Sequence, residues 1–371
     1  MTNIKRTPLA DVHETLGARM VEFAGFWMPV SYGGIIEEHL AVRERVGLFD
    51  VSHMGEFIVS GARAREFVNQ IITNDCSKLE PGAIQYTAMC CENGTVVDDL
   101  LVSAIDGDRL MLVVNASNID KDWEHIAGFD RPGGVEIENA SDGFALLAVQ
   151  GPKCREVLHS SPLFDGLKQQ IDKIPYYRGF TFEHDGSEIF VSRTGYTGEL
   201  GFEIFLPSVK AVTYWNEILR TGSDFGIKPI GLGARDTLRF EASYCLYGHE
   251  LDENTSPLEA GLGWVVKLKK EQFCGIDALR AEKKNGPART LVGFELEGRN
   301  IARQGYAVLT DGVAVGHVTS GAFAPALAKS LCMALIKRDN KNQERMFEIE
   351  IRNKKVPAKL TPLPFYKSRS K

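Results

Sequence analysis

The chain has 371 residues, of which 44% are hydrophobic and 25% charged, and its formal net charge is −6. This length exceeds that of one typical core, so we expect two or three domains. The negative charge argues against a general nucleic-acid-binding protein, and no apolar run reaches the roughly 20 residues that a membrane-spanning helix needs.

Seven cysteines and eight histidines occur, but none lies in a C-x-x-C or H-E-x-x-H spacing. The adjacent Cys90 and Cys91 are badly placed to form a structural disulfide with each other. We therefore predict reduced thiols and no metal site. The first ten residues lack the apolar segment of a secretory signal, which predicts a soluble, intracellular protein.

The first helix is predicted at residues 35–46, because Ile36 and Leu40 can share one face. This phase leaves Glu38 and Arg43 mostly in solvent. A short apolar strand or loop follows at 48–53, and a second helix is expected at 63–72.

A hairpin is predicted next. Residues 86–92 and 95–103 are apolar runs that flank Asn93-Gly94, and this dipeptide suits a tight turn in which both residues take positive φ. Further strands are expected at 110–115, 144–150, 189–193 and 202–206, and further helices at 118–127, 153–158, 209–220 and 234–244. Strands and helices mix without strict alternation, so the fold class is predicted to be α+β.

The composition changes after residue 283. Residues 283–287 are polar with Gly and Pro, which predicts a linker. Beyond it, alternating apolar residues such as Val292, Phe294 and Leu296 predict short strands, and Asp311-Gly312 predicts a hairpin turn. We expect a C-terminal β-barrel or sandwich of roughly 80 residues.

The first candidate for chemistry is the pair Asp98-Asp99 inside the apolar strand at 96–102. Strand side chains alternate, so the two carboxylates point to opposite faces. At least one must be partly buried, at a cost of several kcal/mol unless it is paired. A capping or ion-pairing role is as reasonable as a functional one, and periodicity does not decide which Asp faces a ligand.

The second candidate is the loop at 193–201, which holds three glycines but places Glu199 where a phosphate-binding loop has Lys. It is either a Gly-rich hairpin connection or a loop that presents Tyr196 and Glu199 to a flat, amine-bearing ligand. The third is Gly-Leu-Gly-Ala-Arg-Asp at 231–236. Arg235 lies in the first turn of a predicted helix, where the dipole disfavours a cation, so it meets either an anionic ligand or an acid such as Glu241.

Eight stretches in order along the chain resemble the aminomethyltransferase family over nearly its whole length. They are Gly-Ala-Arg-Met-Val at 17–21, Asp-Val-Ser-His-Met at 50–54, Val-Asp-Asp-Leu at 97–100, Val-Gln-Gly-Pro at 149–152, Thr-Gly-Tyr-Thr-Gly-Glu at 194–199, Gly-Leu-Gly-Ala-Arg-Asp at 231–236, Leu-Tyr-Gly at 246–248 and Val-Thr-Ser-Gly at 318–321.

The resemblance implies a three-domain cloverleaf around a central folate channel. It places a discontinuous folate-binding domain at 1–55 and 140–250, a second α+β domain at 56–139, a connecting segment at 251–283 and a β-barrel domain at 284–371. It also implies transfer of a methylene group to tetrahydrofolate from an aminomethyl group on the lipoylated H-protein of the glycine cleavage system, with release of ammonia. A monomer in the cytoplasm is expected, or in the mitochondrial matrix if the source is a eukaryote.

Carried over by position, the resemblance makes Asp98 the catalytic acid. Glu199 is expected to hold the amino edge of the pteridine, and Arg235 an anionic group. The folate pocket is expected to be lined by the remaining candidates, Met54, Tyr86, Asn115, Tyr196 and Tyr366.

Three other functions stay open at this point. One is a folate-dependent demethylase of the same fold. Another is a folate-binding accessory protein for iron–sulfur assembly, whose K-G-C-Y-x-G-Q-E signature is missing from residues 270–277. The last is part of a flavin-dependent sarcosine-type oxidase, which requires an N-terminal G-x-G-x-x-G domain.

Overall fold

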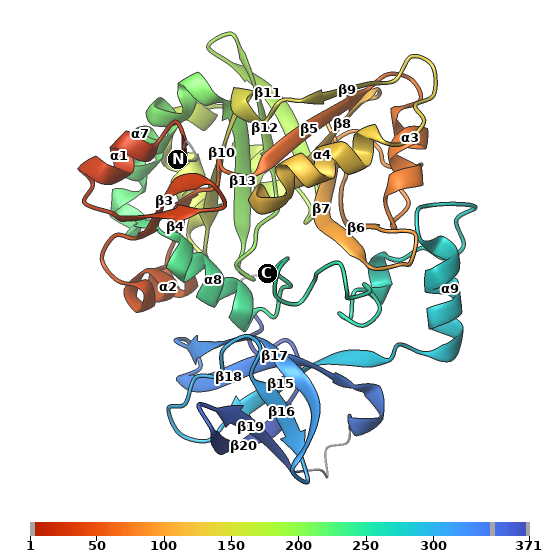
Figure 1. The fold of residues 1–371 in the computed structure, drawn as a ribbon. Helices are drawn as coiled ribbons and strands as arrows, with labels where there is room; N and C mark the ends of the chain where they lie inside the picture. The colour runs from red at the N-terminus through yellow and green to blue at the C-terminus, as the bar shows by residue number, and fades with distance from the viewer. Residues whose placement is uncertain (1–3, 342–345, 369–371) are drawn as a thin grey trace.

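The computed structural model describes residues 4–341 and 346–368. Two sheets with their helices lie side by side, and a barrel lies below both (Figure 1). Within the described ranges, no helix combines the length and apolar character needed to cross a membrane.

The first sheet has six strands in the order β11-β12-β13-β10-β4-β14. Helices α1, α5, α6 and α7 cover one face, where Tyr214 and Trp215 are fully buried. Its elements are β4 (Gly47–Asp50), β10 (Phe144–Gln150), β11 (Gly179–His184), β12 (Ser187–Ser192), β13 (Gly201–Pro207), β14 (Lys228–Ile230), α1 (Ala10–Thr15), α5 (Cys154–Ser160), α6 (Lys168–Lys173) and α7 (Ala211–Gly222).

The second sheet is formed by the residues between β4 and β10. Its five strands run in the order β6-β7-β8-β5-β9, and Phe57 and Phe67 lie in its core. The predicted Asn-Gly hairpin is confirmed as β6 and β7, but the predicted turn geometry is wrong at Asn93, because only Gly94 of the pair takes a positive φ. The elements are β5 (Gly55–Ser60), α3 (Ala64–Ile71), β6 (Ile84–Cys90), β7 (Val96–Ala104), β8 (Arg109–Val114), α4 (Ile119–Ala127) and β9 (Glu136–Asn139).

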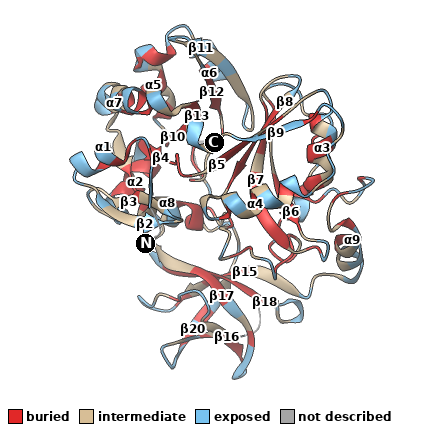
Figure 2. Cartoon of the chain, turned by 45° about the horizontal axis from the view of Figure 1, so that its top comes forward, coloured by how far each residue is buried: buried red, intermediate tan, exposed pale blue. Residues whose placement is uncertain are grey.

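The two sheets pack against each other through a shared apolar cluster. Phe49, Leu146 and Phe205 of the first sheet meet Met111 and Val113 of the second. Figure 2 shows buried residues concentrated on the strands and exposed residues on the outer sides of the helices. A small sheet in the order β1-β3-β2 and two helices complete this region: β1 (Lys5–Arg6), β2 (Arg19–Phe23), β3 (Phe26–Ser31), α2 (Ile35–Glu44) and α8 (Leu232–Glu241).

The C-terminal strands close into a barrel in the order β15-β18-β17-β16-β19-β20, which confirms the predicted β-barrel. Phe294 and Phe347 meet in its core with ring centroids 5.0 Å apart. Phe240 of α8 packs against Leu331 and Met333 and so fastens the barrel to the sheets. The strands are β15 (Arg289–Leu296), β16 (Ala307–Thr310), β17 (Val313–Ala324), β18 (Lys329–Lys337), β19 (Phe347–Ile351) and β20 (Lys354–Thr361).

Two local predictions are wrong. Helix α9 (Ile276–Asn285) extends into the predicted linker, so only 286–288 separate it from β15. The predicted phase of α2 is also wrong, because Glu38 and Arg43 are buried while Ile36 is 54% exposed. Short 3₁₀ turns connect the elements: η1 (Ala116–Asn118), η2 (Ser141–Gly143), η3 (Pro162–Phe164), η4 (Ser208–Lys210), η5 (Ser223–Phe225), η6 (Gly263–Val265) and η7 (Arg338–Asn340).

Candidate functional site

A cavity of about 640 Å³ lies where the two sheets, α8 and the segment after the barrel meet. This volume is within the range of small-molecule sites, and its lining is mainly apolar and aromatic with a few polar groups. Five of the side chains predicted to contact a ligand line it: Met54, Tyr86, Asn115, Tyr196 and Arg235.

Asp99 is the carboxylate of β7 that lines the cavity. Its Oδ2 accepts a hydrogen bond of 2.7 Å from the Tyr86 hydroxyl, and its Oδ1 accepts one of 3.1 Å from Asn115 Nδ2. Burial and the neighbouring Asp98 carboxylate raise the pKa of Asp99 from its ordinary value to about 7. A group with that pKa can take up and return a proton near neutral pH.

Asp98 departs from the prediction, since it is fully buried behind the cavity wall. Its oxygens accept three hydrogen bonds, from Asn115 N at 3.0 Å, Asn115 Nδ2 at 2.8 Å and Asn118 Nδ2 at 2.7 Å. Asp98 thus holds the chain where β8 ends, and the alternation of β7 turns Asp99 toward the cavity instead.

A second cavity carboxylate, Glu203, comes from β13 of the other sheet. It accepts a hydrogen bond from the Thr194 hydroxyl. Burial raises the pKa of Glu203, and the nearby positive charge of Arg235 opposes that rise. The cavity therefore has one carboxylate from each sheet.

The Gly-rich loop is shaped by Gln150, the last residue of β10. A Cβ on Gly195 or Gly201 would lie 2.0 Å or 2.2 Å from Gln150 Oε1. The amide instead accepts from the Thr197 hydroxyl at 2.9 Å and donates to the Thr194 carbonyl at 3.2 Å. These glycines bring the loop onto Gln150 rather than onto a phosphate.

Two aromatic rings and one cation form the flat part of the cavity wall. Tyr196 stacks on Tyr244 with ring centroids 5.8 Å apart and an interplanar angle of 28°. The guanidinium carbon of Arg235 lies 4.8 Å from the Tyr196 ring centroid. A planar ligand fits such a wall. Glu241, the acid predicted as an alternative partner for Arg235, instead contacts Arg43 and His39.

Arg235 is held in place by the start of α8. The Gly231 backbone N–H donates to Glu38 Oε2 at 2.8 Å, while Glu38 Oε1 accepts from the backbone N–H groups of residues 32–34. A Cβ on Gly231 would lie 2.4 Å from the backbone carbonyl of Val30. Helix α8 therefore packs directly on β3 at a position that only glycine fits.

Gly231→Ala should lower the free energy of unfolding by about 1–3 kcal/mol, because the added methyl group overpacks a backbone contact. Chemical denaturation of the two proteins measures this difference. Gly33→Ala is the matched control, since its Cβ would meet only Glu37 Oε2 at 3.6 Å. An equal loss in both variants would contradict the close-contact argument.

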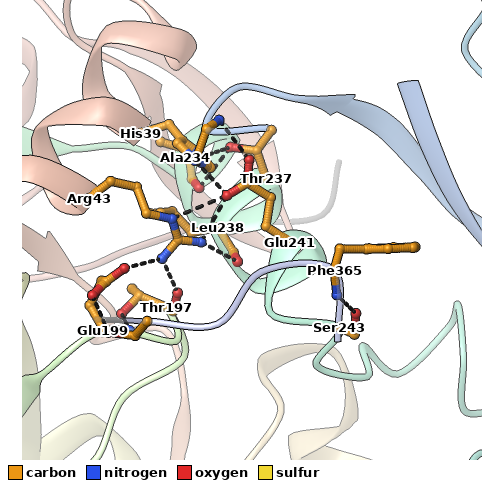
Figure 3. A network of polar contacts seen from close by, with 12 residues as sticks. His39, Arg43, Thr197, Glu199, Ala234, Thr237, Leu238, Glu241, Ser243 and Phe365 are labelled. Carbon is orange, nitrogen blue, oxygen red and sulfur yellow. Dashed lines mark hydrogen bonds and ion pairs between the residues drawn. The ribbon is translucent and has the colours of Figure 1, made fainter. Parts of the chain in front are cut away.

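Glu199 also departs from the prediction, because it does not line the cavity. It receives Arg43 Nη1 at 3.0 Å, and the same guanidinium contacts Glu241 Oε2 at 3.1 Å. Glu241 also contacts His39 Nε2 at 3.0 Å. Figure 3 shows this network, with Arg43 of α2 between Glu199 and Glu241.

Tyr366 belongs to that same network rather than to the cavity lining. Its ring centroid lies 3.9 Å from the Arg43 guanidinium carbon, and its backbone N–H donates to the Glu241 carbonyl at 2.8 Å. The nearby Leu363 and Pro364 do line the cavity. The segment after the barrel thus closes one wall of the cavity, and Tyr366 anchors it.

The sequence interpretation overlooked Glu203. The argument applied to the Asp pair also fits this residue, which is a lone carboxylate in the apolar strand β13. Trp264, which lines the cavity and is 59% exposed, had no comparable signal. Within residues 4–341 and 346–368, no group of three or more His, Cys, Asp or Glu side chains is placed to hold a metal ion.

Comparison with known families gives two matches that together span most of the chain. Residues 9–270 match the family described as the GCVT N-terminal domain. Residues 289–367 match the glycine cleavage T-protein C-terminal barrel domain.

Individual relatives agree with these matches. An aminomethyltransferase from Caldanaerobacter subterraneus subsp. tengcongensis is 48% identical over 371 residues, covering 100% of this chain and 98% of the relative. One from Halothermothrix orenii is 46% identical over 362 residues, covering 98% and 100%. The crystal structure of glycine cleavage system aminomethyltransferase T from Bartonella henselae superposes with a TM-score of 0.90 at 34% identity and 99% coverage of both chains.

Proposed function

Because this chain belongs to the glycine cleavage T-protein family, we propose that its central cavity binds tetrahydrofolate between Asp99, Glu203 and Arg235. The chain is an enzyme of the aminomethyltransferase class. It moves the methylene of an aminomethyl group from the lipoyl sulfur of the H-protein to tetrahydrofolate, and the products are 5,10-methylenetetrahydrofolate, ammonia and the free dihydrolipoyl thiol.

One observation carries the assignment of the site: two carboxylates, one from each sheet, and a guanidinium share one aromatic-walled cavity. A pteridine is flat and carries an amino group and ring N–H groups beside a carbonyl oxygen. Glu203 can accept from the amino edge, Arg235 can donate to an oxygen, and the Tyr196 ring can stack on the plane. The residues present therefore fit the folate.

When bound, tetrahydrofolate supplies two nucleophilic nitrogens, N5 and N10, which together give up two protons as the methylene bridge forms. We assign Asp99 to proton transfer with these nitrogens. Its raised pKa suits both directions of transfer, toward the carboxylate and back to the departing amine. Tyr86 and Asn115 orient the carboxylate through its two oxygens.

A single-turnover experiment tests this function. Aminomethyl-loaded H-protein is mixed with the chain and tetrahydrofolate, and methylenetetrahydrofolate and ammonia are measured. We expect both in equal amounts and only when folate is present. Folate binding without either product would contradict the transfer and would favour a demethylase of the same fold.

Glu203→Gln should weaken tetrahydrofolate binding by about 10–100-fold, because a charge-assisted hydrogen bond to the pteridine is replaced by a neutral one. Isothermal titration of the folate measures the change. Glu183→Gln, an exposed glutamate of β11 in the same sheet, is the control. Unchanged affinity in Glu203→Gln would remove Glu203 from the site.

We also propose that the chain is a monomer when free of H-protein and acts in the cytoplasm. The relatives described above are bacterial, which supports this compartment. The domain division 1–55 with 140–250, 56–139, 251–283 and 284–371 is proposed as well, supported by the membership of the sheets. Sedimentation of the purified chain tests the monomer, and limited proteolysis tests the boundaries.

A further inference from the structure

A third carboxyl group, Asp122 of α4, lies behind the Asp99 wall. It is fully buried, and neither of its oxygens receives a hydrogen bond from any donor among the described residues. The group that it contacts is the carboxyl of Asp98. A buried carboxyl group placed against another carboxyl group needs an explanation, because both cannot be ionised without a large cost.

The neighbouring cation Lys121 does not neutralise this pair. Lys121 Nζ donates to the Val97 carbonyl at 2.7 Å and to the Tyr247 hydroxyl at 2.6 Å, and it lies 3.7 Å from Glu253. The two carboxyl groups must therefore share a single negative charge. Asp98 accepts three N–H donors and Asp122 accepts none among the described residues, so we place the shared proton on Asp122.

We propose that Asp122 is a positioning residue, whose carboxylic acid O–H donates to the Asp98 carboxylate and so fixes the Asn115 amide against Asp99. This inference rests on the proposed role of Asp99. The chain of contacts is continuous: Asp122 contacts Asp98, Asn115 Nδ2 lies 2.8 Å from Asp98 Oδ1, and the same nitrogen lies 3.1 Å from Asp99 Oδ1. One amide thus joins the buried pair to the cavity carboxylate.

The charges around these groups agree with this arrangement. Burial first, and then Asp98, raise the pKa of Asp122 to about 11, and Lys121 only partly opposes the rise. The titratable groups around Asp99 are Asp98, Tyr86, Asp122, Tyr196 and Cys245. Those around Asp122 are Asp98, Asp99, Lys121 and Tyr247.

Asp122→Leu removes the donor, and Asp122→Asn keeps an N–H donor without charge. We expect Asp122→Leu to lower kcat about tenfold, the lower end of the cost of losing an orienting outer hydrogen bond. The acidic limb of its pH–rate profile should move to higher pH, because Asp99 loses a well-placed donor, while KM for tetrahydrofolate stays within about twofold. Asp122→Asn should restore most of the lost kcat.

Glu56→Gln is the matched control, since Glu56 is another buried carboxyl, on β5 and outside the cavity lining. Glu56→Gln should leave the pH–rate profile unchanged. A profile in Asp122→Leu that coincides with that of the wild type, with kcat within twofold, would overturn the positioning role.

Infrared difference spectra of wild type minus Asp122→Asn at pH 7 provide a second test that needs neither substrate nor the leucine variant. We expect a protonated carboxyl C=O band that is missing from Asp122→Asn. A carboxylate band in its place would overturn the proposal. The infrared spectrum does not depend on turnover, so it tests the role of Asp122 alone. The single-turnover assay of the wild type tests the proposed function, and the two failures can therefore be told apart.

Discussion

Asp99→Asn should lower turnover by about 10²–10⁴-fold, because it removes a positioned proton acceptor and leaves the shape of the cavity intact. KM for tetrahydrofolate should change much less, since the lost interaction acts mainly in the transition state. Steady-state kinetics at saturating H-protein measures both constants. Asp108→Asn, in the exposed turn after the same strand, is the matched control.

The pH dependence gives a second reading of the same variant. Asp99 has a folded pKa of about 7, above its ordinary value of 3.8. The stability that this group contributes is full below pH 3.8 and is lost as pH rises through 7. Asp99→Asn should therefore become more stable than the wild type as pH rises from 4 to 8. Turnover of the wild type should fall as the pH drops below 7.

Asp98→Asn distinguishes the two carboxylates of β7. Asp98 accepts three hydrogen bonds out of reach of the cavity, so we expect this variant to lose stability more than Asp99→Asn does. The reverse pattern, with Asp98→Asn folded and inactive and Asp99→Asn active, would contradict the assignment of the proton-transferring group.

Arg43→Met should lower the free energy of unfolding by about 3–5 kcal/mol, the usual cost of removing one partner of a buried ion pair. Arg43 is the cation of a network that includes Glu199 and Glu241, whose side chains are 2% and 0% exposed. Its loss leaves two buried carboxylates without that cation and removes the support beneath Tyr366. Urea denaturation measures the change.

Arg63→Met is the matched control. Arg63 pairs with Glu66 on the surface, where the two side chains are 52% and 50% exposed. Exposed ion pairs are screened by solvent and add little to stability, so this variant should remain close to the wild type. Similar losses for the two arginines would contradict the importance given to burial.

Much of the fold could be predicted from local pattern. The Asn93-Gly94 hairpin and the barrel alternation at Val292, Phe294 and Leu296 were identified correctly, because they depend on turn residues and on a period of two. The strand at 144–150 was identified from its continuous apolar run. The phase of α2 was not, because its buried side includes Glu38 and Arg43. Those charges are satisfied by partners far along the chain, among them Gly231 and Glu241.

The site was harder to predict for the same reason. Met54, Tyr86, Asn115, Tyr196 and Arg235 do meet in one cavity. The choice between Asp98 and Asp99 depends on which face of β7 meets the other sheet, and no single strand carries that information. Glu199 and Glu203 lie four residues apart, but Glu203 lines the cavity while Glu199 pairs with Arg43, a partner far along the chain.

The measurement that tests this account most directly is a crystal structure of the chain with tetrahydrofolate bound. The account predicts the pteridine in the cavity, its amino edge on Glu203 and its reacting nitrogens beside Asp99. A folate that lies outside this cavity, or whose pteridine contacts Glu199 in place of Glu203, would contradict it.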